Sequence, residues 1–278
     1  MHLGAPVFEK CDDPEAWVAA LKQLAYGGAY CPVGADAGDD VVRAYAAAAE
    51  QAGIVIAEVG AWSNPISRDD ETRRAALEHC RNQLALADRI GARCCVNIGG
   101  SRGEKWDGPH ADDMTDDTFD LIVETTRSII DAVRPTRTFY TLETMPWMYP
   151  DSADCYVRLI EAIDRKQFAV HLDPTNLISS PRRYFNNGAI IRECIAKLGA
   201  HIRSCHAKDI IMSDSFMVHL DETRPGLGIL DYRVYLAELA QLDPDTPLMI
   251  EHLATAEEYT LAAEYIRSVA DEIGVSFR

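Results

Sequence analysis

The segment TFYTLE at 138–143 and the segment FAVHLD at 168–173 decide the fold, because each is a short apolar run that ends on a carboxylate. The same form recurs in HIRSCH at 201–206, which ends on a histidine, and in PLMIE at 247–251. Short runs rich in β-branched and aromatic residues are typical of strands, and strands that alternate with helical patterns indicate a parallel sheet. The four segments therefore predict parallel strands, each with a polar side chain at its C-terminal end.

The rest of the chain continues this alternation of strands and helices. Four further strand-like runs precede these segments, at 2–8, 29–33, 53–59 and 92–98. Amphipathic helical patterns follow the strands, at 13–25, 40–52, 69–90, 115–133, 151–164, 186–198, 231–240 and 256–273. Eight strands, each followed by a helix, predict one α/β domain over residues 1–278 with the architecture of a (β/α)8 TIM barrel. An open doubly wound sheet is the alternative.

The composition is that of a globular protein with a strong acidic excess. Hydrophobic residues make up 47% and charged residues 26% of the 278 residues, and 44 acidic against 27 basic residues give a formal charge of -17. Such a charge argues against nucleic acid or an anionic membrane as the main partner and favours a small molecule or a metal ion. No apolar run approaches the roughly 18 residues that span a bilayer.

Cysteine usage indicates a cytoplasmic protein. The eight cysteines are irregularly spaced, no C-x-x-C pair occurs, and the N-terminus does not resemble a secretion signal. We therefore expect reduced, mostly buried thiols. The sequence leaves the oligomeric state open, and a homo-oligomer is compatible with it.

Three carboxylates and one histidine stand at the ends of four successive predicted strands, namely Glu143, Asp173, His206 and Glu251. Strand alternation lets all four side chains point into the barrel mouth, where TIM-barrel active sites lie. Singly, each is more commonly a turn residue or a helix cap, so the hypothesis depends on the set. No Lys or Arg stands among the four positions, so the carboxylates would repel one another unless they are protonated or bridged by a cation. The set predicts one divalent metal ion, above all Mn²⁺, with Mg²⁺, Co²⁺ or Zn²⁺ as alternatives.

Five motifs carry a resemblance to a known family: LETMPW, HLDPTN, SCHAKD, PGLGILDY and MIEHL. They are similar to motifs of the sugar phosphate isomerase/epimerase family of xylose-isomerase-like TIM barrels, and the similarity extends over nearly the whole chain. The resemblance implies that Glu143, Asp173, His206 and Glu251 bind one catalytic metal ion and that the two glutamates act as acid and base. The family includes ketose 3-epimerases, hydroxypyruvate isomerases, inosose dehydratases and enzymes of 3-keto sugars, so it implies the fold and the metal site more firmly than the substrate.

One position departs from part of this family. Ketose 3-epimerases and the related apurinic-site endonucleases usually carry a histidine three residues after the aspartate of the sixth strand, where this chain has Asn176. The missing histidine and the charge of -17 argue against a three-zinc endonuclease. An epimerase stays compatible, although a specialist for free ketohexoses is less favoured, and Asn176 becomes a candidate substrate contact.

Two residues in phase with the metal candidates are expected beside them. Lys208, two positions after His206, would bring an ammonium group to neutralise a developing enolate oxygen; its alternative is an ion pair with a neighbouring carboxylate. His171, two positions before Asp173, would orient a ligand or bind the substrate, and a hydrogen-bonded core histidine is an equal alternative.

Three tryptophans follow the third, fourth and fifth predicted strands, and they are Trp62, Trp106 and Trp147. They are candidates for a wall on which a sugar ring or an aglycone packs, although loop tryptophans also cover barrel ends. Other candidate substrate contacts are Glu58 at the end of the third strand, Arg102 and Lys105 in and after a glycine-rich segment, and Arg224 before a PGLG loop. Their alternatives are a surface carboxylate for Glu58 and a plain turn for the PGLG loop.

These residues predict a metal-dependent isomerase or epimerase of a sugar or keto-sugar. The predicted reaction is proton transfer next to a carbonyl through a metal-stabilised enediolate, with Glu143, Glu251 and Lys208 as catalytic residues. The alternative within the same family is a lyase, either similar to inosose dehydratase or acting on a 3-keto-glycoside. A non-catalytic sugar- or metal-binding subunit is the third possibility.

Overall fold

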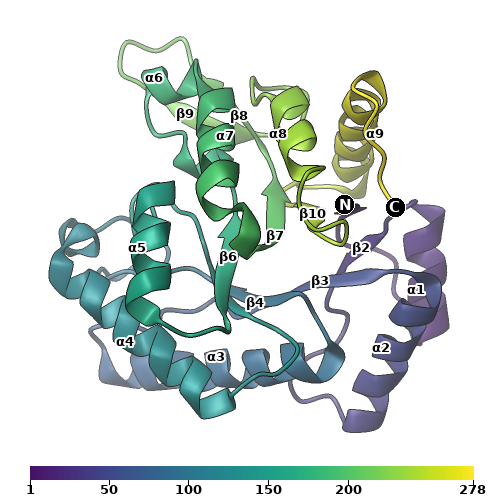
Figure 1. Cartoon of the computed structure of the whole chain (residues 1–278), viewed down its shortest axis with the longest axis horizontal. Helices are drawn as coiled ribbons and strands as arrows, with labels where there is room; N and C mark the ends of the chain where they lie inside the picture. Colours follow the sequence, from purple (N-terminus) through teal and green to yellow (C-terminus); the bar gives the residue numbers. More distant parts are fainter.

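Each of the eight predicted strand segments forms a parallel strand, and the strands close into a barrel in a computed structural model that describes residues 1–278 (Figure 1). The barrel order is β1-β10-β7-β6-β5-β4-β3-β2. The strands span His2–Gly4 (β1), Gly28–Tyr30 (β2), Val55–Gly60 (β3), Cys94–Asn97 (β4), Tyr140–Glu143 (β5), Phe168–Leu172 (β6), Ile202–Ala207 (β7) and Pro247–Ile250 (β10). The predicted TIM barrel is confirmed, and the open-sheet alternative is wrong.

The first two strands are shorter than the sequence predicts. β1 ends before Pro6 and β2 ends before Pro32. Proline has no N–H to donate to a neighbouring strand, so the ladder stops ahead of each of these residues.

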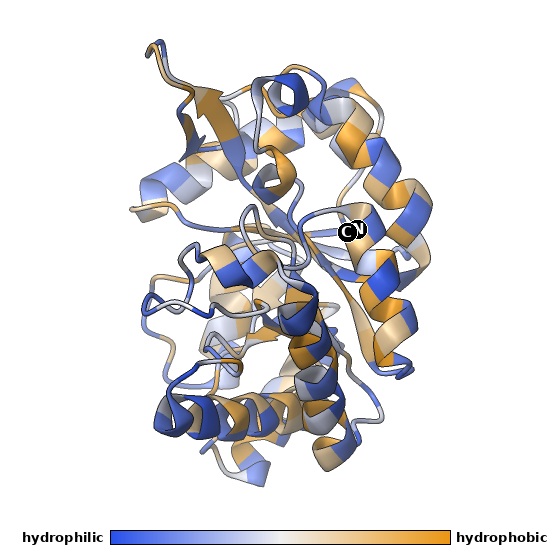
Figure 2. Ribbon diagram, turned by 90° about the vertical axis from the view of Figure 1, so that its left-hand side faces the viewer, coloured by the Kyte–Doolittle hydropathy of each residue, from blue (hydrophilic) through white to orange (hydrophobic).

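The helices surround the barrel, and all but α2 and α7 begin at a side-chain cap. They span Pro14–Gln23 (α1), Asp39–Ala52 (α2), Asp70–Ile90 (α3), Asp116–Val133 (α4), Ala153–Ile163 (α5), Pro181–Tyr184 (α6), Asn187–Leu198 (α7), Tyr232–Leu239 (α8) and Ala256–Glu272 (α9). Asp13 caps α1, since its carboxylate accepts a hydrogen bond from the Ala16 amide at 2.7 Å, as the Asp-Pro start predicts. Figure 2 shows hydrophilic and hydrophobic residues alternating along the outer helices, as expected where one helix face packs on the barrel. None of the helices combines the length and the apolar character that a bilayer span requires.

One contiguous core of 63 buried residues joins the strands to the surrounding helices. Its largest fully buried side chains include four tyrosines, Tyr140, Tyr156, Tyr232 and Tyr235. A buried hydroxyl needs a hydrogen-bond partner. Those of Tyr156, Tyr232 and Tyr235 donate to backbone carbonyls, and that of Tyr140 bonds the side chains of Asn97 and Cys80.

A hairpin after β7 interrupts the barrel pattern. β8 (Asp209–Met212) pairs antiparallel with β9 (Leu220–Thr223), and Figure 1 shows both beside α6 and α7, away from the barrel. The sequence predicts an extended loop here. The hairpin was missed because its strands show no regular alternation: two buried residues open β8, and β9 has half-buried residues at its ends and exposed ones between.

Candidate metal centre

The side chains of Glu143, Asp173, His206 and Glu251 converge at the C-terminal ends of β5, β6, β7 and β10. One ligand atom from each lies within 4.8 Å of the others. His206 Nδ1 lies 3.0 Å from Glu143 Oε1 and 2.8 Å from Glu251 Oε1. All four residues are buried. The structure thus brings together the four residues that the strand phase predicts.

Buried hydroxyl groups hold the ends of β5 and β6 together. The Asp173 amide donates to Thr144 Oγ1 at 3.0 Å, and this hydroxyl donates to the Asp173 carbonyl at 2.7 Å. Tyr156 of α5 accepts a hydrogen bond from the Leu142 amide at 3.1 Å and donates to the Ala169 carbonyl at 2.9 Å. The positions of the glutamate and the aspartate are therefore fixed by backbone bonds and by a packed helix.

Two further tyrosines position the other two strand ends. Tyr235 of α8 donates to the carbonyl of His206 at 3.0 Å, and Tyr30 of β2 donates to the carbonyl of Ile250 at 3.2 Å. Such bonds orient strands where the ladder ends, so the site is preorganised by the barrel.

Beneath the four residues lies a buried hydrogen-bonded group centred on Glu58. Its Oε1 lies 3.2 Å from His206 Nε2, and its Oε2 lies 2.9 Å from His171 Nε2 and accepts the Ser204 hydroxyl at 2.9 Å. Burial opposes ionisation of Glu58, but His206 and His171 outweigh it, and the pKa of this carboxyl is lowered. A carboxylate on Nε2 leaves Nδ1 of His206 directed at the other three ligand candidates, as in carboxylate–histidine–metal arrangements.

This geometry bears on two predictions. Glu58 is 2% exposed, so the surface alternative is wrong; it lines the cavity, although most of its hydrogen-bonding capacity is used by protein groups. His171 is fully buried, contacts Glu58 and does not line the cavity, which fits the alternative of a hydrogen-bonded core histidine.

Lys208 brings a buried positive charge into the ligand set. Its Nζ lies 2.6 Å from Glu251 Oε1, 2.9 Å from Asp173 Oδ2 and 3.8 Å from Glu143 Oε1. The premise that no basic residue offsets the three carboxylates is therefore wrong. Lys208 stands two residues after a ligand candidate, and β7 continues far enough to direct it to the same point.

Burial and mutual charge set the protonation of the cluster. Burial, together with nearby Glu143 and Glu251, raises the pKa of Asp173 to about 6, although Lys208 acts in the opposite direction. Burial also opposes ionisation of Glu143 and Glu251, but Lys208 and His206 outweigh it and lower both pKa values. For His206, burial is outweighed by the surrounding carboxylates, and its pKa is raised.

The chemistry of the set fits a divalent cation. Asp173 Oδ2 and Glu251 Oε1 are buried, and both form ion pairs with Lys208 but accept no well-aligned hydrogen bond. Carboxylate oxygens gathered within 4.8 Å of one another and of one imidazole nitrogen match the donor preference of Mn²⁺, Mg²⁺ and Zn²⁺.

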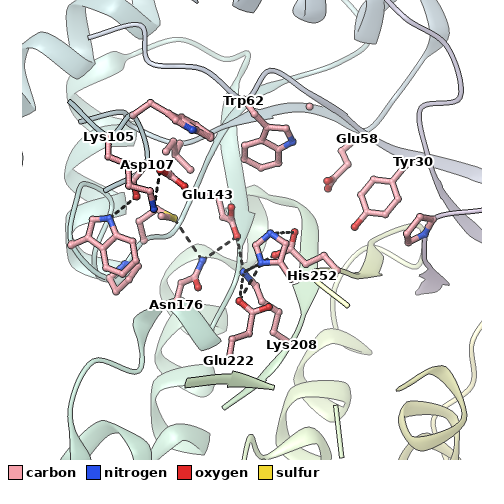
Figure 3. A pocket seen from close by; sticks show the side chains of 18 of the residues that line it. Tyr30, Glu58, Trp62, Lys105, Asp107, Glu143, Asn176, Lys208, Glu222 and His252 are labelled. Carbon is pink, nitrogen blue, oxygen red and sulfur yellow. Dashed lines mark hydrogen bonds and ion pairs between the residues drawn. The ribbon is translucent and has the colours of Figure 1, made fainter. Parts of the chain in front are cut away.

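A cavity of about 520 Å³ opens above this cluster (Figure 3). Glu143 and Glu251 line it, whereas Asp173 and His206 are fully buried and do not. Asn176 also lines the cavity and donates its amide to Glu143 Oε1 at 3.1 Å. Of the four ligand candidates, only the two glutamates reach the space where a substrate would bind.

The predicted aromatic wall lines the same cavity. Trp62, Trp106 and Trp147 are all cavity residues, and Lys105 stands with them. Arg102 and Arg224 do not line it, so the structure does not support them as substrate contacts. The Arg102 guanidinium turns back to donate to the Ile66 carbonyl, and that of Arg224 donates to the carbonyl of the following proline at 3.4 Å.

Among the cavity residues that the sequence did not predict, two are ionisable groups that contact Lys208 or Glu251, namely His252 and Glu222. His252 follows Glu251, so strand alternation would direct it away, but its φ of 57° reverses the chain and turns it into the cavity. Its Nδ1 lies 3.2 Å from Glu222 Oε2. Glu222 belongs to the unexpected strand β9, and no signal in the sequence places it at the site.

A buried carboxylate tethers the PGLG loop. Asp209 Oδ1 accepts the amides of Ile210 and Leu230 at 2.9 and 2.8 Å, and Oδ2 accepts those of Gly226 and Gly228 at 3.0 and 3.1 Å. A plain turn is the alternative that the sequence gives for this loop. Two amides of the loop and the amide of Leu230 just after it bind one buried side chain, and these bonds make it a fixed turn.

We expect Asp209→Ala to destabilise the fold by about 2–4 kcal/mol, because it leaves several buried amide groups without acceptors. Urea unfolding measures the loss, and hydrogen exchange of residues 226–230 should quicken. Asp214→Ala, an exposed change in the same hairpin, is the control. Equal stability of the two variants would show that the tether contributes little.

The strands form a closed parallel barrel, and carboxylates and a histidine cluster at its C-terminal strand ends. TIM-barrel proteins have this architecture, with their active sites in the barrel mouth. The chain belongs to the xylose isomerase-like TIM barrel family, whose sequence pattern matches residues 18–269. The resemblance seen in the five sequence motifs is thereby confirmed.

Solved structures with this fold differ in activity. D-psicose 3-epimerase from Clostridium cellulolyticum, solved with D-tagatose, is 15% identical, with a TM-score of 0.68 over 99% of this chain and 98% of that chain. A probable 3-DHS dehydratase from Bacillus anthracis is 14% identical, with a TM-score of 0.70 over 97% and 98%. Endonuclease IV from Thermus thermophilus is 14% identical, with a TM-score of 0.73 over 97% and 98%. No curated protein matches the sequence. At this identity the similarity shows the fold, and the reaction must be argued from the site.

Proposed function

We propose that this protein is a divalent-metal-dependent isomerase or epimerase that moves a proton next to the carbonyl of a sugar or keto-sugar. The observation that carries the proposal is that the four ligand candidates differ in their access to the cavity. Asp173 and His206 are sealed below the cavity, while Glu143 and Glu251 face both the proposed ion and the substrate space. Carboxylates in that position suit acid–base work as well as ligation.

Glu143, Asp173, His206 and Glu251 would hold the ion, with Mn²⁺ proposed as the resident metal. A bound divalent ion supplies Lewis-acid chemistry, since it polarises a carbonyl oxygen and acidifies the adjacent C–H bond. The proposed cytoplasmic location rests on eight free cysteines, which suit a reducing compartment. The charge of -17 and the enclosed cavity favour a small-molecule substrate over nucleic acid.

Three residues of the chain carry the proton chemistry. One of Glu143 and Glu251 removes the proton from carbon, and the other returns a proton to the opposite face in an epimerase. In an isomerase the proton returns to the neighbouring carbon. Lys208 keeps its ammonium beside Glu251 and faces the cavity, where it offsets negative charge that develops on a substrate oxygen.

Deuterium incorporation tests this proposal. In heavy water, the metal-loaded enzyme should label one carbon of a true keto-sugar substrate, next to the carbonyl, because each glutamate exchanges its proton with solvent. NMR of substrate and product after partial conversion locates the label, and Glu251→Gln should label at least about 10²-fold more slowly.

The outcomes separate the related chemistries. Prompt labelling of the product supports an epimerase, and partial retention of the substrate proton supports an isomerase. An eliminated leaving group with a new unsaturated carbonyl would replace the proposal with the lyase alternative. Conversion without any deuterium in substrate or product would show that neither glutamate acts as the acid or the base.

A further inference from the structure

The cavity wall changes character between the metal candidates and the loops that follow β3, β4 and β5. Near Glu143, Lys208 and Glu251 the lining is charged. On the side of these three loops it is apolar, and its residues are Trp62, Ile98, Trp106, Met145, Pro146 and Trp147. The three strands are neighbours in the barrel, so these residues form one continuous side of the cavity, which we call the tryptophan wall.

The indoles of the tryptophan wall are incompletely covered by protein. Trp62, Trp106 and Trp147 are 39%, 37% and 39% exposed, whereas the fourth tryptophan, Trp17, is buried in the core. Exposed aromatic residues gathered on one side of a cavity are typical of a surface that a ligand covers.

Two of these indoles are held in place by specific contacts. Trp147 Nε1 donates to the Asp107 carbonyl at 3.0 Å, so its only N–H is used and the ring alone is left for a ligand. Trp62 folds over Gly60, where an added Cβ would lie 2.5 Å from Trp62 Nε1. Rings fixed before binding lose little entropy when a ligand covers them.

The wall offers few polar groups to a second sugar unit. Lys105 and Asp107 are its charged residues, and they pair with each other at 3.2 Å, which leaves the indole N–H groups of Trp62 and Trp106 as further donors. Hydroxyl groups packed against Ile98, Met145 and the indole faces would lose hydrogen bonds to water with little replacement. A flat apolar group has no such cost and stacks on indole rings.

We propose that the substrate is a keto-sugar that carries a planar apolar substituent, such as an aryl aglycone, which packs on the tryptophan wall while the sugar part lies at Glu143 and Glu251. This inference rests on the proposed function, whose site it extends. A cavity of about 520 Å³ has the size that holds drug-sized ligands, so the sugar and its substituent fit in it together.

A matched pair of probes tests the inference. Phenyl and methyl glycosides of the same hexose, each with a ketone at carbon 3, are titrated into the metal-loaded protein, and calorimetry gives each Kd. The phenyl form should bind at least about tenfold tighter, and it should quench tryptophan fluorescence. In Trp106→Ala and Trp147→Ala the advantage of the phenyl form should fall below about threefold.

Phe216→Ala is the control, because this fully exposed aromatic residue of the hairpin lies outside the cavity and its loss should leave the tenfold advantage intact. No phenyl advantage, with the methyl form still labelled by deuterium, would overturn this inference and leave the proposed function standing. If a keto-disaccharide binds as much tighter than the methyl form as the phenyl form does, the inference is overturned and the wall holds a second sugar unit. A tryptophan-dependent advantage without deuterium exchange would support the wall and contradict the proposed reaction.

Discussion

Asp173→Asn is expected to abolish metal binding and to lower turnover at least about 10³-fold, since a metal ion supplies several kcal/mol of transition-state stabilisation. The change is nearly isosteric. The amide of Thr175 donates to Asp173 Oδ1 at 2.9 Å, and an asparagine oxygen can still accept that bond. The change removes the negative charge of the carboxylate, whose buried Oδ2 lies 2.9 Å from Lys208 Nζ. Elemental analysis and the metal-induced rise in Tm measure binding, because an ion that binds only the folded state stabilises it.

Asp120→Asn is the matched control for this variant. Asp120 is exposed on α4, so its replacement should change neither metal content nor turnover. Circular dichroism should show both variants folded. If Asp173→Asn keeps full metal content and full activity, the ion is not held by this cluster.

The sequence determines the barrel more completely than it determines the loops. Eight apolar segments mark eight strands because both faces of a barrel strand are buried, and strand phase then directs Glu143 and Glu251 to one point. The hairpin carrying Glu222 lacks this signal, since neither of its strands is buried along its whole length or alternates regularly. His252 was not predicted to face the cavity because its positive φ breaks the alternation of side chains along the strand, on which the prediction depends.

Charge balance was the hardest part of the site to predict. Spacing places Lys208 near the cavity, yet spacing alone does not show how far its four-carbon side chain reaches. Arg102 shows the reverse case, because a long side chain in a loop beside the cavity turned to a backbone carbonyl instead. A long cationic side chain can reach several partners, and only the packed structure shows which one it contacts.

The position of Lys208 suggests a role in the protein without metal. Its side chain is 2% exposed, and its ammonium pairs with Glu251 and Asp173 through oxygens that the proposed ion would also use. Burial disfavours the charged amine, but the carboxylates outweigh it and raise the pKa of Lys208. The lysine is thus an internal cation that compensates the carboxylates when no ion does.

Lys208→Met is therefore expected to destabilise the metal-free protein by about 3–5 kcal/mol, because it leaves buried carboxylates uncompensated. The apparent Tm should fall on the order of 10 °C. Mn²⁺ should raise the Tm of this variant by more than it raises that of the wild type, since the ion restores the missing positive charge. Turnover of the metal-loaded variant should still be lowered about 10²–10³-fold, because the donor that faces the substrate oxygen is absent. Calorimetric scans with and without Mn²⁺ measure both effects on Tm.

Lys197→Met is the matched control, because Lys197 also contacts two carboxylates, Asp154 and Glu193, each at 2.6 Å. Its side chain is 36% exposed, so water and salt compensate these carboxylates when the lysine is removed, and the Tm should change little. The comparison bears mainly on burial, since each lysine makes two ion pairs shorter than 3 Å, although Lys208 also lies within 4 Å of Glu143 and Glu222. If both variants lose the same stability and Mn²⁺ rescues neither, the ammonium of Lys208 is an ordinary structural ion pair and the proposed competition with the metal ion does not occur.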